Sequence, residues 1–499
     1  MQIETLKKLK SGTDVRGVAV EGNADVNLTD EAVDKICRAF VKWLSLKFDK
    51  TRFKIAIGND SRISAQRIKA AATNAFVQSG CSVVYTGLSS TPSMFILLKQ
   101  SDFGCDASVM ITASHMPYDR NGLKFFTTEG GLDGKDIDEI LQIAASEDFI
   151  YAQTAVCYTE KSFMDEYSSI LVKKVVDACG ELPLKGKKII VDAGNGAGGF
   201  FAEKVLAPLG ADISGSQFLH PDGTFPNHIP NPEDKNAIDS LSRAVIANGA
   251  DFGIIFDTDV DRAACVDGDG QEINRNSLIA LISGILLNER AGVIVTDSVT
   301  SDYLTEFIEQ NGGKHLRFKR GYRNVIDKCV ELNESGVYSP LAIETSGHAA
   351  FKENYYLDDG AYLIVKILIS LALQAKEGKN LTSIISTLKK PVEEAEVRIT
   401  FSENSVDFKK EGAQVIEDLK RIAESDEELT LAPDNYEGVR MNLFGGWLLV
   451  RMSVHDPVMP INFESGELGG NKKAAIKLTE ILQSYDFLDV TNLNKFIEL

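Results

Sequence analysis

Short runs of apolar, β-branched residues alternate with segments of helical periodicity along most of the chain. Residues 53–60 (FKIAIGND) predict a strand, 65–80 (AQRIKAAATNAFVQSG) a helix and 81–87 (CSVVYTG) a second strand. The same succession recurs over 187–259 and again over 292–312. Because this alternation is typical of parallel sheets covered by helices, we expect three α/β units.

The order of the elements changes from residue 394 onward. Two strands follow one another there, with helices on either side, which predicts a small α+β domain. The expected elements are strands at 397–401, 447–454 and 459–465 and helices at 406–425 and 472–485.

Composition and charge restrict the class of protein. A chain of 499 residues is too long for one hydrophobic core, so three or four domains are expected. The formal net charge of −19 repels nucleic acids and anionic membranes, and neither is expected as a partner. It would repel a phosphorylated substrate as well, so a phosphate site must be locally basic or neutralised by a metal. The 7 cysteines lack metal-like spacing and the amino-terminal segment lacks a secretory signal, which predicts a reduced, cytoplasmic protein.

The first segment with candidate chemistry is TASHMPYDRNGLKFF, residues 112–126. It follows an apolar strand, so Ser114 is expected where a strand ends, the place where α/β sheets bind ligands. Ser114 and His115 could support nucleophilic chemistry, with Lys124 as a cation or proton acceptor. A lone Ser-His pair is more often a polar turn, whereas the complete string is far more specific.

The second segment is FDTDVDR, in which Asp257, Asp259 and Asp261 alternate directly after the apolar strand FGIIF. Every second side chain of an extended segment points the same way, so we expect three carboxylates facing one hard cation. Such a set leaves room for a phosphate oxygen, which suits Mg²⁺, and Arg262 adds a bidentate phosphate donor. A solvated acidic turn is the alternative, and the adjoining buried strand favours the metal site.

Two further segments carry weaker signals. In IETSGHAAF (343–351), Glu344, Ser346 and His348 could hydrogen-bond sugar hydroxyls, although Glu344 could equally cap a helix. In LLVRMSVHDPVMPINF (448–463), a turn between two strands presents a cation and a hydroxyl suited to a terminal phosphate. The same turn is a common surface pattern.

Together and in this order, the four segments resemble the α-D-phosphohexomutase superfamily over essentially the whole chain. Other segments are similar to the family's as well: SGTDVRG with Arg16, GNDSRIS with Gly58, Asp60, Arg62 and Ser64, TPSMFI with Thr91 and Pro92, and PDGTFPNHIPNPE from Pro221. The resemblance implies an α/β fold of three similar mixed α/β domains followed by a smaller α+β carboxyl-terminal domain, arranged around one cleft.

The resemblance also implies a role for each site residue. Ser114 would be the phosphoserine, and the metal ligands would be Ser114, Asp257, Asp259 and Asp261. The groups around the transferring phosphoryl group would be Ser114, His115, Lys124, Arg16 and Arg262. The substrate contacts would be Gly321, Tyr322, Arg323, Glu344, Ser346, His348, Arg451, Ser453 and His455.

The implied function is a mutase that interconverts hexose 1-phosphate and hexose 6-phosphate of glucose or mannose. Its cofactors would be Mg²⁺ and a hexose 1,6-bisphosphate that acts as activator and intermediate. Glucosamine mutases usually carry Gln between the Glu and Ser of the sugar loop, where this chain has Thr345, which favours neutral hexoses. The alternatives are a phosphoglucosamine or phospho-N-acetylglucosamine mutase, a metal-dependent serine phosphatase and a catalytically silent sugar-phosphate sensor.

The expected domains are a phosphoserine-bearing domain (1–158), a metal-binding domain (159–272), a sugar-binding domain (273–393) and a phosphate-binding domain (394–499). The expected partner is a small sugar phosphate, and the oligomeric state is left open. One departure concerns the phosphate loop, where Val454 and His455 replace the small polar residues usual in the family.

Overall fold

The protein is described from a computed structural model that covers residues 2–22, 24–100, 102–147, 149, 157–433, 435–453 and 456–498. The chain forms two compact units. The first comprises Met1–Leu278 with Ser346–Ser383, and the second Ile279–Thr345 with Ile384–Leu499. Among the described residues, no helix combines the length and the apolar character that a membrane span requires.

The first unit opens with a mixed sheet in the strand order β1-β2-β6-β5-β3-β4-β8, with β7 beside β6. Strands β5, β3, β4 and β8 pair in parallel, with β8 at the edge of the sheet, and β6 and β2 pair antiparallel on the opposite side. The strand bounds are β1 (Lys10–Ser11), β2 (Asp14–Val18), β3 (Lys54–Asn59), β4 (Ser82–Leu88), β5 (Ala107–Ile111), β6 (Arg120–Thr127), β7 (Gly130–Gly131) and β8 (Tyr158–Glu160).

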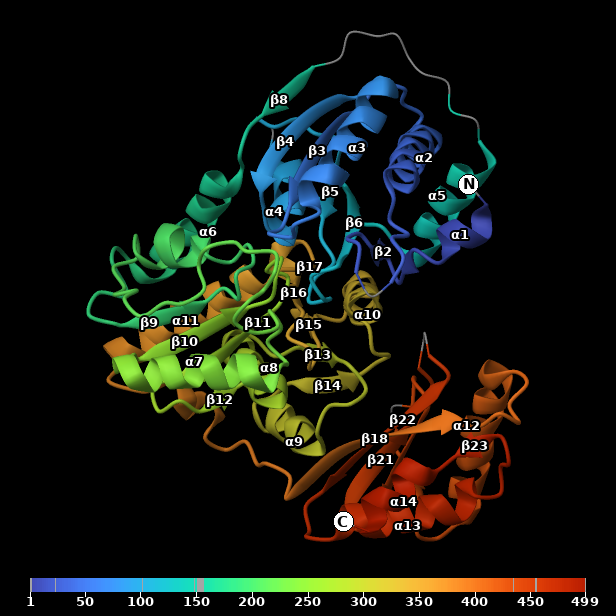
Figure 1. Cartoon of the computed structure of the whole chain (residues 1–499). Helices are drawn as coiled ribbons and strands as arrows, with labels where there is room; N and C mark the ends of the chain where they lie inside the picture. Colours follow the sequence, from blue (N-terminus) through green and yellow to red (C-terminus); the bar gives the residue numbers. More distant parts are fainter. Residues whose placement is uncertain are drawn as a thin grey trace. The chain divides into compact units, whose positions relative to one another are not determined.

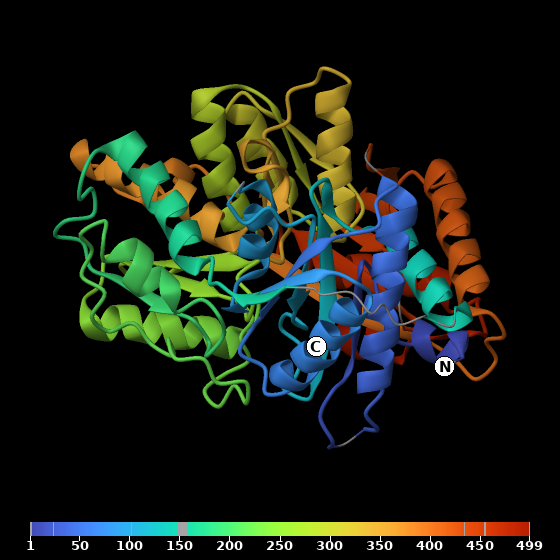
Figure 2. The same cartoon turned by 90° about the horizontal axis from the view of Figure 1, so that it is seen from above.

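The core of this sheet lies under its helices because their apolar stripes meet the alternating apolar residues of the strands. Figures 1 and 2 show α2 as a long blue helix beside the strands. On the other face, Ser108 of β5 donates a hydrogen bond of 2.6 Å to a carbonyl of α4. The helices are α1 (Ile3–Lys7), α2 (Asp30–Phe48), α3 (Ala65–Gln78), α4 (Thr91–Ile96) with a 3₁₀ turn at Leu97–Lys99, and α5 (Gly134–Ser146).

The second sheet of this unit has the order β12-β11-β10-β9, with β9 and β10 parallel and the others antiparallel. Helix α7 covers it, and α6 packs against α11. Within the strand–helix–strand succession expected over 187–259, the first helical segment is a π-helix over Phe201–Leu206. The remaining bounds are α6 (Met164–Cys179), β9 (Ile189–Asp192), α7 (Lys235–Asn248), β10 (Phe252–Phe256), β11 (Ala263–Asp267), β12 (Glu272–Ile273), β16 (Ala349–Phe351), β17 (Leu357–Asp358) and α11 (Gly360–Lys376).

The second unit contains three parallel strands, β13 (Val293–Thr296), β14 (Lys314–Arg317) and β15 (Leu341–Ile343). Its helices are α9 (Asp302–Gln310) and α10 (Tyr322–Glu334), and α8 (Arg275–Glu289) crosses the boundary between the units. The alternation of strands and helices follows the pattern expected from the sequence.

An antiparallel sheet completes the second unit, in the order β19-β20-β21-β22-β18-β23. One hydrophobic core joins it to its helices, so the expected α+β arrangement at the carboxyl end is confirmed. The bounds are β18 (Glu393–Phe401), α12 (Phe408–Ser425), β19 (Thr430–Leu431), β20 (Val439–Leu443), β21 (Gly446–Val450), β22 (Val458–Ser465), α13 (Gly470–Leu482), β23 (Leu488–Asp489) and α14 (Thr491–Glu498).

Arg440 fastens this antiparallel sheet to the loop after β13. Its buried guanidinium donates hydrogen bonds of 3.0 Å to the carbonyls of Ser298 and Thr300. The same group lies 3.5 Å from the ring centre of Trp447, whose indole N–H donates to Glu464 at 2.9 Å. A cation stacked on an indole and tied to two carbonyls makes this a firm junction.

Candidate active site

Ser114 lies in the loop between β5 and β6 in a strained conformation. All five residues of β5 are buried, and the chain leaves the sheet directly after Ile111. Ser114 has a φ of 52°, a left-handed value that is unfavourable for a residue with a side chain. Its backbone N–H donates a hydrogen bond of 2.9 Å to the Thr112 hydroxyl. Strain of this kind concentrates where the fold must present one side chain in a fixed direction.

The Ser114 hydroxyl is held between an anion and a cation. Its Oγ donates to Asp257 Oδ2 at 3.0 Å and accepts from Arg262 Nη2 at 3.0 Å. Ser114 is only 3% exposed. A hydroxyl that is buried, oriented and placed beside a guanidinium can carry a phosphoryl group, because the guanidinium would offset the charge that a phosphate brings.

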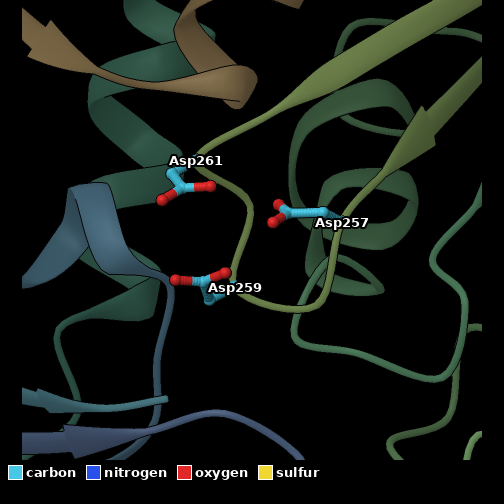
Figure 3. A group of neighbouring side chains, drawn as sticks. All are labelled: Asp257, Asp259 and Asp261. Carbon is cyan, nitrogen blue, oxygen red and sulfur yellow. The ribbon is translucent and has the colours of Figure 1, made fainter. Parts of the chain in front are cut away.

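The three aspartates converge, but not for the reason that the sequence suggested. The expectation of an extended segment is wrong, because residues 257–261 form a turn and Val260 has a left-handed φ of 66°. This turn gathers the three side chains so that one ligand atom of each lies within 4.8 Å of the others (Figure 3). The carboxylates therefore meet by reversal of the backbone rather than by alternation along a strand.

The electrostatics of the triad fit a divalent cation. Burial raises the pKa of Asp257, and repulsion from Asp261 and Asp259 raises it further. Asp259 Oδ1 and Asp261 Oδ1 are buried and have no hydrogen-bond donor within the described part of the chain. Buried carboxylate oxygens that lack donors are the ligands that a hard cation such as Mg²⁺ takes. The triad can therefore bind a metal ion.

Lys124 and His348 both lie beside Asp261 of the triad. Lys124 Nζ donates a hydrogen bond of 2.8 Å to Asp261 Oδ2, and His348 Nε2 lies 3.6 Å from Oδ1. Although burial opposes it, the positive charge of Lys124 and the contact with His348 lower the pKa of Asp261. Ser346 Oγ lies 3.0 Å from His348 Nδ1, so two of the predicted sugar-contacting residues belong to the Ser114 region of the first unit.

His115 lies beside the guanidinium of Arg262. Its Nδ1 is 2.6 Å from Arg262 Nη2, and since a guanidinium only donates, Nδ1 must accept. Although His115 is exposed overall, desolvation and the charges of Arg262 and Arg16 lower its pKa, which favours the neutral imidazole. Arg16 lies on β2 opposite Gly122 and donates a hydrogen bond of 2.6 Å to Asp14. It acts on this site through its charge.

Thr91 fixes Asp259, a contact that sequence reasoning missed. Its backbone N–H donates a hydrogen bond of 2.8 Å to the Asp259 carbonyl, and its hydroxyl donates to Asp259 Oδ2. One oxygen of Asp259 is thereby occupied and the other, Oδ1, remains for a metal. The signal was present in the Thr-Pro segment, but the spacing along the chain says nothing about which residue it contacts.

The segment PDGTFPNHIPNPE contacts Arg262. Sequence reasoning missed this contact as well. Asn231 Oδ1 accepts from Arg262 Nη1 at 3.2 Å. The segment is fastened by His228, whose Nε2 lies 3.0 Å from Asp192 Oδ2 and whose Nδ1 lies 2.8 Å from the Ile229 carbonyl. Two acceptors facing the two ring nitrogens favour the doubly protonated imidazolium. Burial lowers the pKa of His228, but Asp192, the Ile229 carbonyl and Asp234 more than offset this and raise it.

In the second unit, Glu344 ties together the two predicted sugar loops. Its Oε1 accepts from the backbone N–H of Gly321 at 2.6 Å, and Gly321 has the positive φ of 109° that glycine tolerates. Tyr322 begins α10, and Arg323 pairs with Asp327 at 2.8 Å on the surface of the same helix. The Thr345 hydroxyl donates to Asp297 at 2.7 Å and is buried.

Arg451 follows β21 and is 8% exposed. Burial and the nearby positive charge of Arg320 lower its pKa, and its Nη2 lies 3.8 Å from Glu396. Two neighbouring guanidinium groups favour a bound anion. Ser453 Oγ accepts from the Asp456 N–H at 3.3 Å, and the predicted contact from His455 lies outside the described residues.

Comparison with known proteins agrees with this arrangement. Three family models match in succession, all described as phosphoglucomutase/phosphomannomutase, alpha/beta/alpha: domain I over residues 7–151, domain II over 165–270 and domain III over 274–391. The chain belongs to the phosphoglucomutase/phosphomannomutase family. The expected superfamily and the expected enzyme class, a mutase, are thereby confirmed.

Relatives in this family match along most of their length. A phosphoglucomutase of Neisseria meningitidis is 29% identical over 94% of this chain and 96% of its own. A phosphomannomutase/phosphoglucomutase of Pseudomonas putida is 31% identical over 83% of both chains. A phosphoglucomutase/phosphomannomutase family protein from Burkholderia thailandensis has a similar crystal structure, with a TM-score of 0.78 and 25% identity over 97% of this chain and 98% of that one.

Proposed function

We propose that this chain is a phosphohexomutase that interconverts hexose 1-phosphate and hexose 6-phosphate by passing a phosphoryl group through Ser114. The observation that carries the proposal is the position of the Ser114 hydroxyl, 3.0 Å from both Asp257 and Arg262 at the edge of the aspartate triad. Family membership supports the reaction class.

The reaction consists of two phosphoryl transfers that balance one another. In the first, the free hydroxyl of the hexose phosphate attacks the phosphorus of phospho-Ser114, and the bond from phosphorus to Oγ breaks. The sugar hydroxyl loses its proton and Oγ regains one, which leaves a hexose 1,6-bisphosphate and the free serine. After the bisphosphate turns over, Oγ attacks the phosphorus of its other phosphate, and the product leaves with a free hydroxyl.

The residues around Oγ stabilise the charge that moves between them. Arg262 donates to Oγ, and the neutral His115, whose Nδ1 accepts from the same guanidinium, holds that donor in place as the oxygen loses or gains its bond to phosphorus. Lys124, at 2.8 Å from Asp261, keeps one carboxylate charged and in place. A Mg²⁺ ion bound by Ser114, Asp257, Asp259 and Asp261 would supply further neutralisation of the phosphoryl oxygens.

Several of the residues that would contact the substrate belong to the second unit. Glu344, with Gly321, Tyr322 and Arg323, would orient the sugar, and Arg451 with Ser453 would bind the phosphate that is not reacting. Thr345 faces Asp297, so the sugar loop presents Glu344 without a neighbouring amide. This supports glucose and mannose phosphates over amino sugars.

The proposal extends to the organisation of the protein. The four functional segments would lie in domains at 1–158, 159–272, 273–393 and 394–499. All 7 cysteines are free thiols, and six of them are buried, which supports a reducing, cytoplasmic location.

The test supplies Mg²⁺, a trace of the hexose 1,6-bisphosphate and, separately, the 1-phosphates of glucose, mannose and glucosamine. We expect 6-phosphates from glucose and mannose at higher rates than from glucosamine, and little release of free phosphate. Intact mass after treatment with the bisphosphate should show one added phosphate, absent in Ser114→Ala. Phosphate uptake by that variant would refute the role of Ser114. Release of free phosphate as the main product would indicate a phosphatase.

A further inference from the structure

Arg62 is a fully buried arginine whose guanidinium points into the loop that carries Ser114. It lies between β3 and α3, in the segment GNDSRIS, and its side chain is 0% exposed. The proposed reaction assigns it no role, and the sequence motif alone does not say what it contacts.

The guanidinium donates hydrogen bonds to four carbonyls of one loop. Nη1 donates to Pro117 at 2.7 Å and to Arg120 at 2.9 Å. Nη2 donates to Met116 at 2.6 Å and also to the carbonyl of Ser114 itself. Because these carbonyls turn toward a common centre, they need a donor group with several N–H bonds in a fixed plane, and the guanidinium is the side chain that provides this.

The guanidinium is itself held in place from the other side. Asp60 Oδ2 lies 3.3 Å from Nε, and Asp60 Oδ1 accepts from the Arg62 backbone N–H at 2.9 Å. The ring of Phe225 lies 5.2 Å from the guanidinium carbon. Gly223 approaches this segment so closely that a Cβ there would come within 2.4 Å of the Ile63 nitrogen. The position of the Arg62 guanidinium is thus fixed, and the loop binds to it.

The loop has a strained conformation that needs fixed hydrogen-bond donors to hold it. Ser114 is held at a φ of 52°, a left-handed conformation that the loop residue would leave if it were released. A change in that angle moves Oγ away from Asp257 and Arg262, since both contacts depend on the direction of the side chain. An error of about 1 Å in such a position costs about 100-fold in rate.

We propose that Arg62 is the positioning residue of the phosphoryl-carrying loop: by binding the carbonyls of Ser114, Met116, Pro117 and Arg120 it fixes the left-handed serine and aims its hydroxyl. The inference rests on the proposed function of Ser114. It assigns Arg62 an effect on transfer and on exclusion of water from the phosphoserine, and none on the grip of the sugar phosphate.

The experiment compares Arg62→Lys and Arg62→Met with a matched control, Arg38→Lys. Arg38 is 3% exposed in α2, and its guanidinium binds Asp34 at 2.8 Å and 3.0 Å and the side chain of Gln78 at the end of α3. The folded fraction of each variant is measured by circular dichroism and thermal melting. Rates are then expressed per folded molecule. Phosphate on Ser114 is followed by intact mass after addition of glucose 1,6-bisphosphate, and kcat, KM and release of free phosphate by steady-state assay.

For Arg62→Lys we expect kcat and the rate of Ser114 phosphorylation to fall about 100-fold, because a lysine keeps the charge but not the planar set of donors. KM for glucose 1-phosphate should stay within about twofold, and free phosphate per turnover should rise. Arg38→Lys should keep both kcat and the ratio of transfer to hydrolysis at the wild-type value, whatever its melting temperature. Guanidinium ion added to Arg62→Ala, below denaturing concentrations, should restore part of the transfer rate.

The outcomes separate the inference from the function on which it rests. If the Arg62 variants match Arg38→Lys in kcat and in the ratio of transfer to hydrolysis per folded molecule, Arg62 is only structural and the inference is wrong. An Arg62 variant that loses folded protein but keeps its kcat overturns it in the same way. If the wild type takes up no phosphate on Ser114, the proposed function fails, and the inference with it.

Discussion

The Ser114 region of the first unit and the substrate-contacting region proposed for the second unit are built differently. Around Ser114, nearly every polar side chain is buried and held by others, as with Asp259 by Thr91 and Arg262 by Asn231. In the second unit, Arg323 pairs on a helix surface and Glu344 accepts from the backbone of a neighbouring loop. Buried side chains hold one another in the first region, whereas the second is proposed to exchange some of its contacts for those of a substrate.

The sharpest way to break this comparison is to remove one carboxylate of the triad. Asp259→Asn should raise the Mg²⁺ concentration for half-maximal activity by at least about 100-fold, because an amide oxygen is a weak ligand for a hard cation. The measurement is a metal titration of mutase activity, with chelation of the wild type as reference. Asp297→Asn removes an equally buried carboxylate from the second unit and should leave the metal requirement unchanged. Full wild-type activity in excess chelator would remove the metal from the proposal.

Loss of a contact in the second unit should appear in binding instead. Arg451→Ala is expected to raise KM about 10- to 100-fold with kcat nearly unchanged, since a charge-assisted hydrogen bond is worth roughly 1.5–3 kcal/mol. The control is Arg398→Ala, an exposed arginine that pairs with the same Glu396 at 2.9 Å and should leave KM unaltered. A fall in kcat with KM unchanged would place Arg451 in the chemical step.

Variants of Thr91 test whether its hydroxyl positions Asp259 of the triad. Thr91→Val keeps the shape but removes the hydroxyl that donates to Asp259 Oδ2, so the affinity for Mg²⁺ should fall about 10-fold. Thr91→Ser restores the hydroxyl and should restore the affinity. Equal metal titrations for the valine and serine variants would show that the hydroxyl does not position Asp259.

The smallest expected effect concerns His228, which fastens the segment whose Asn231 contacts Arg262. Because its pKa is raised in the folded protein, its contribution to stability is complete below the ordinary value near ~6.5 and is lost as pH rises through the raised value. His228→Gln should therefore lower Tm by ~2 °C more at pH 6 than at pH 9. The control is His220→Gln, which removes an exposed histidine directly before the segment. A His228→Gln deficit that is equal at pH 6 and pH 9 would contradict the charged pair.

Most of the fold could be predicted from the sequence because its strands and helices follow the local periodicity of apolar residues. The candidate site could be predicted in part because its polar residues directly follow strands. The strand FGIIF and the three aspartates after it are visible in the sequence, and their convergence was expected. The turn that brings them together was not expected, because a left-handed Val260 cannot be inferred from residue type. β-branched residues normally avoid that conformation. Likewise Thr91, Asn231 and Arg62 were visible as members of family-like segments. Their partners lie far away in the chain, and only the folded structure brings them together.

The stack of Arg440 on Trp447 also makes the protein convenient to observe. The chain has 2 tryptophans, and each compact unit contains one of them. Trp43, in the first unit, packs against Phe40 and donates to Glu139 at 2.9 Å, whereas Trp447 reports on the junction of the antiparallel sheet with the loop after β13. Replacing Trp43 by phenylalanine leaves a single fluorophore at that junction, quenched or shifted by the cation above it. Its emission then reports on the state of that one contact in the unlabelled protein.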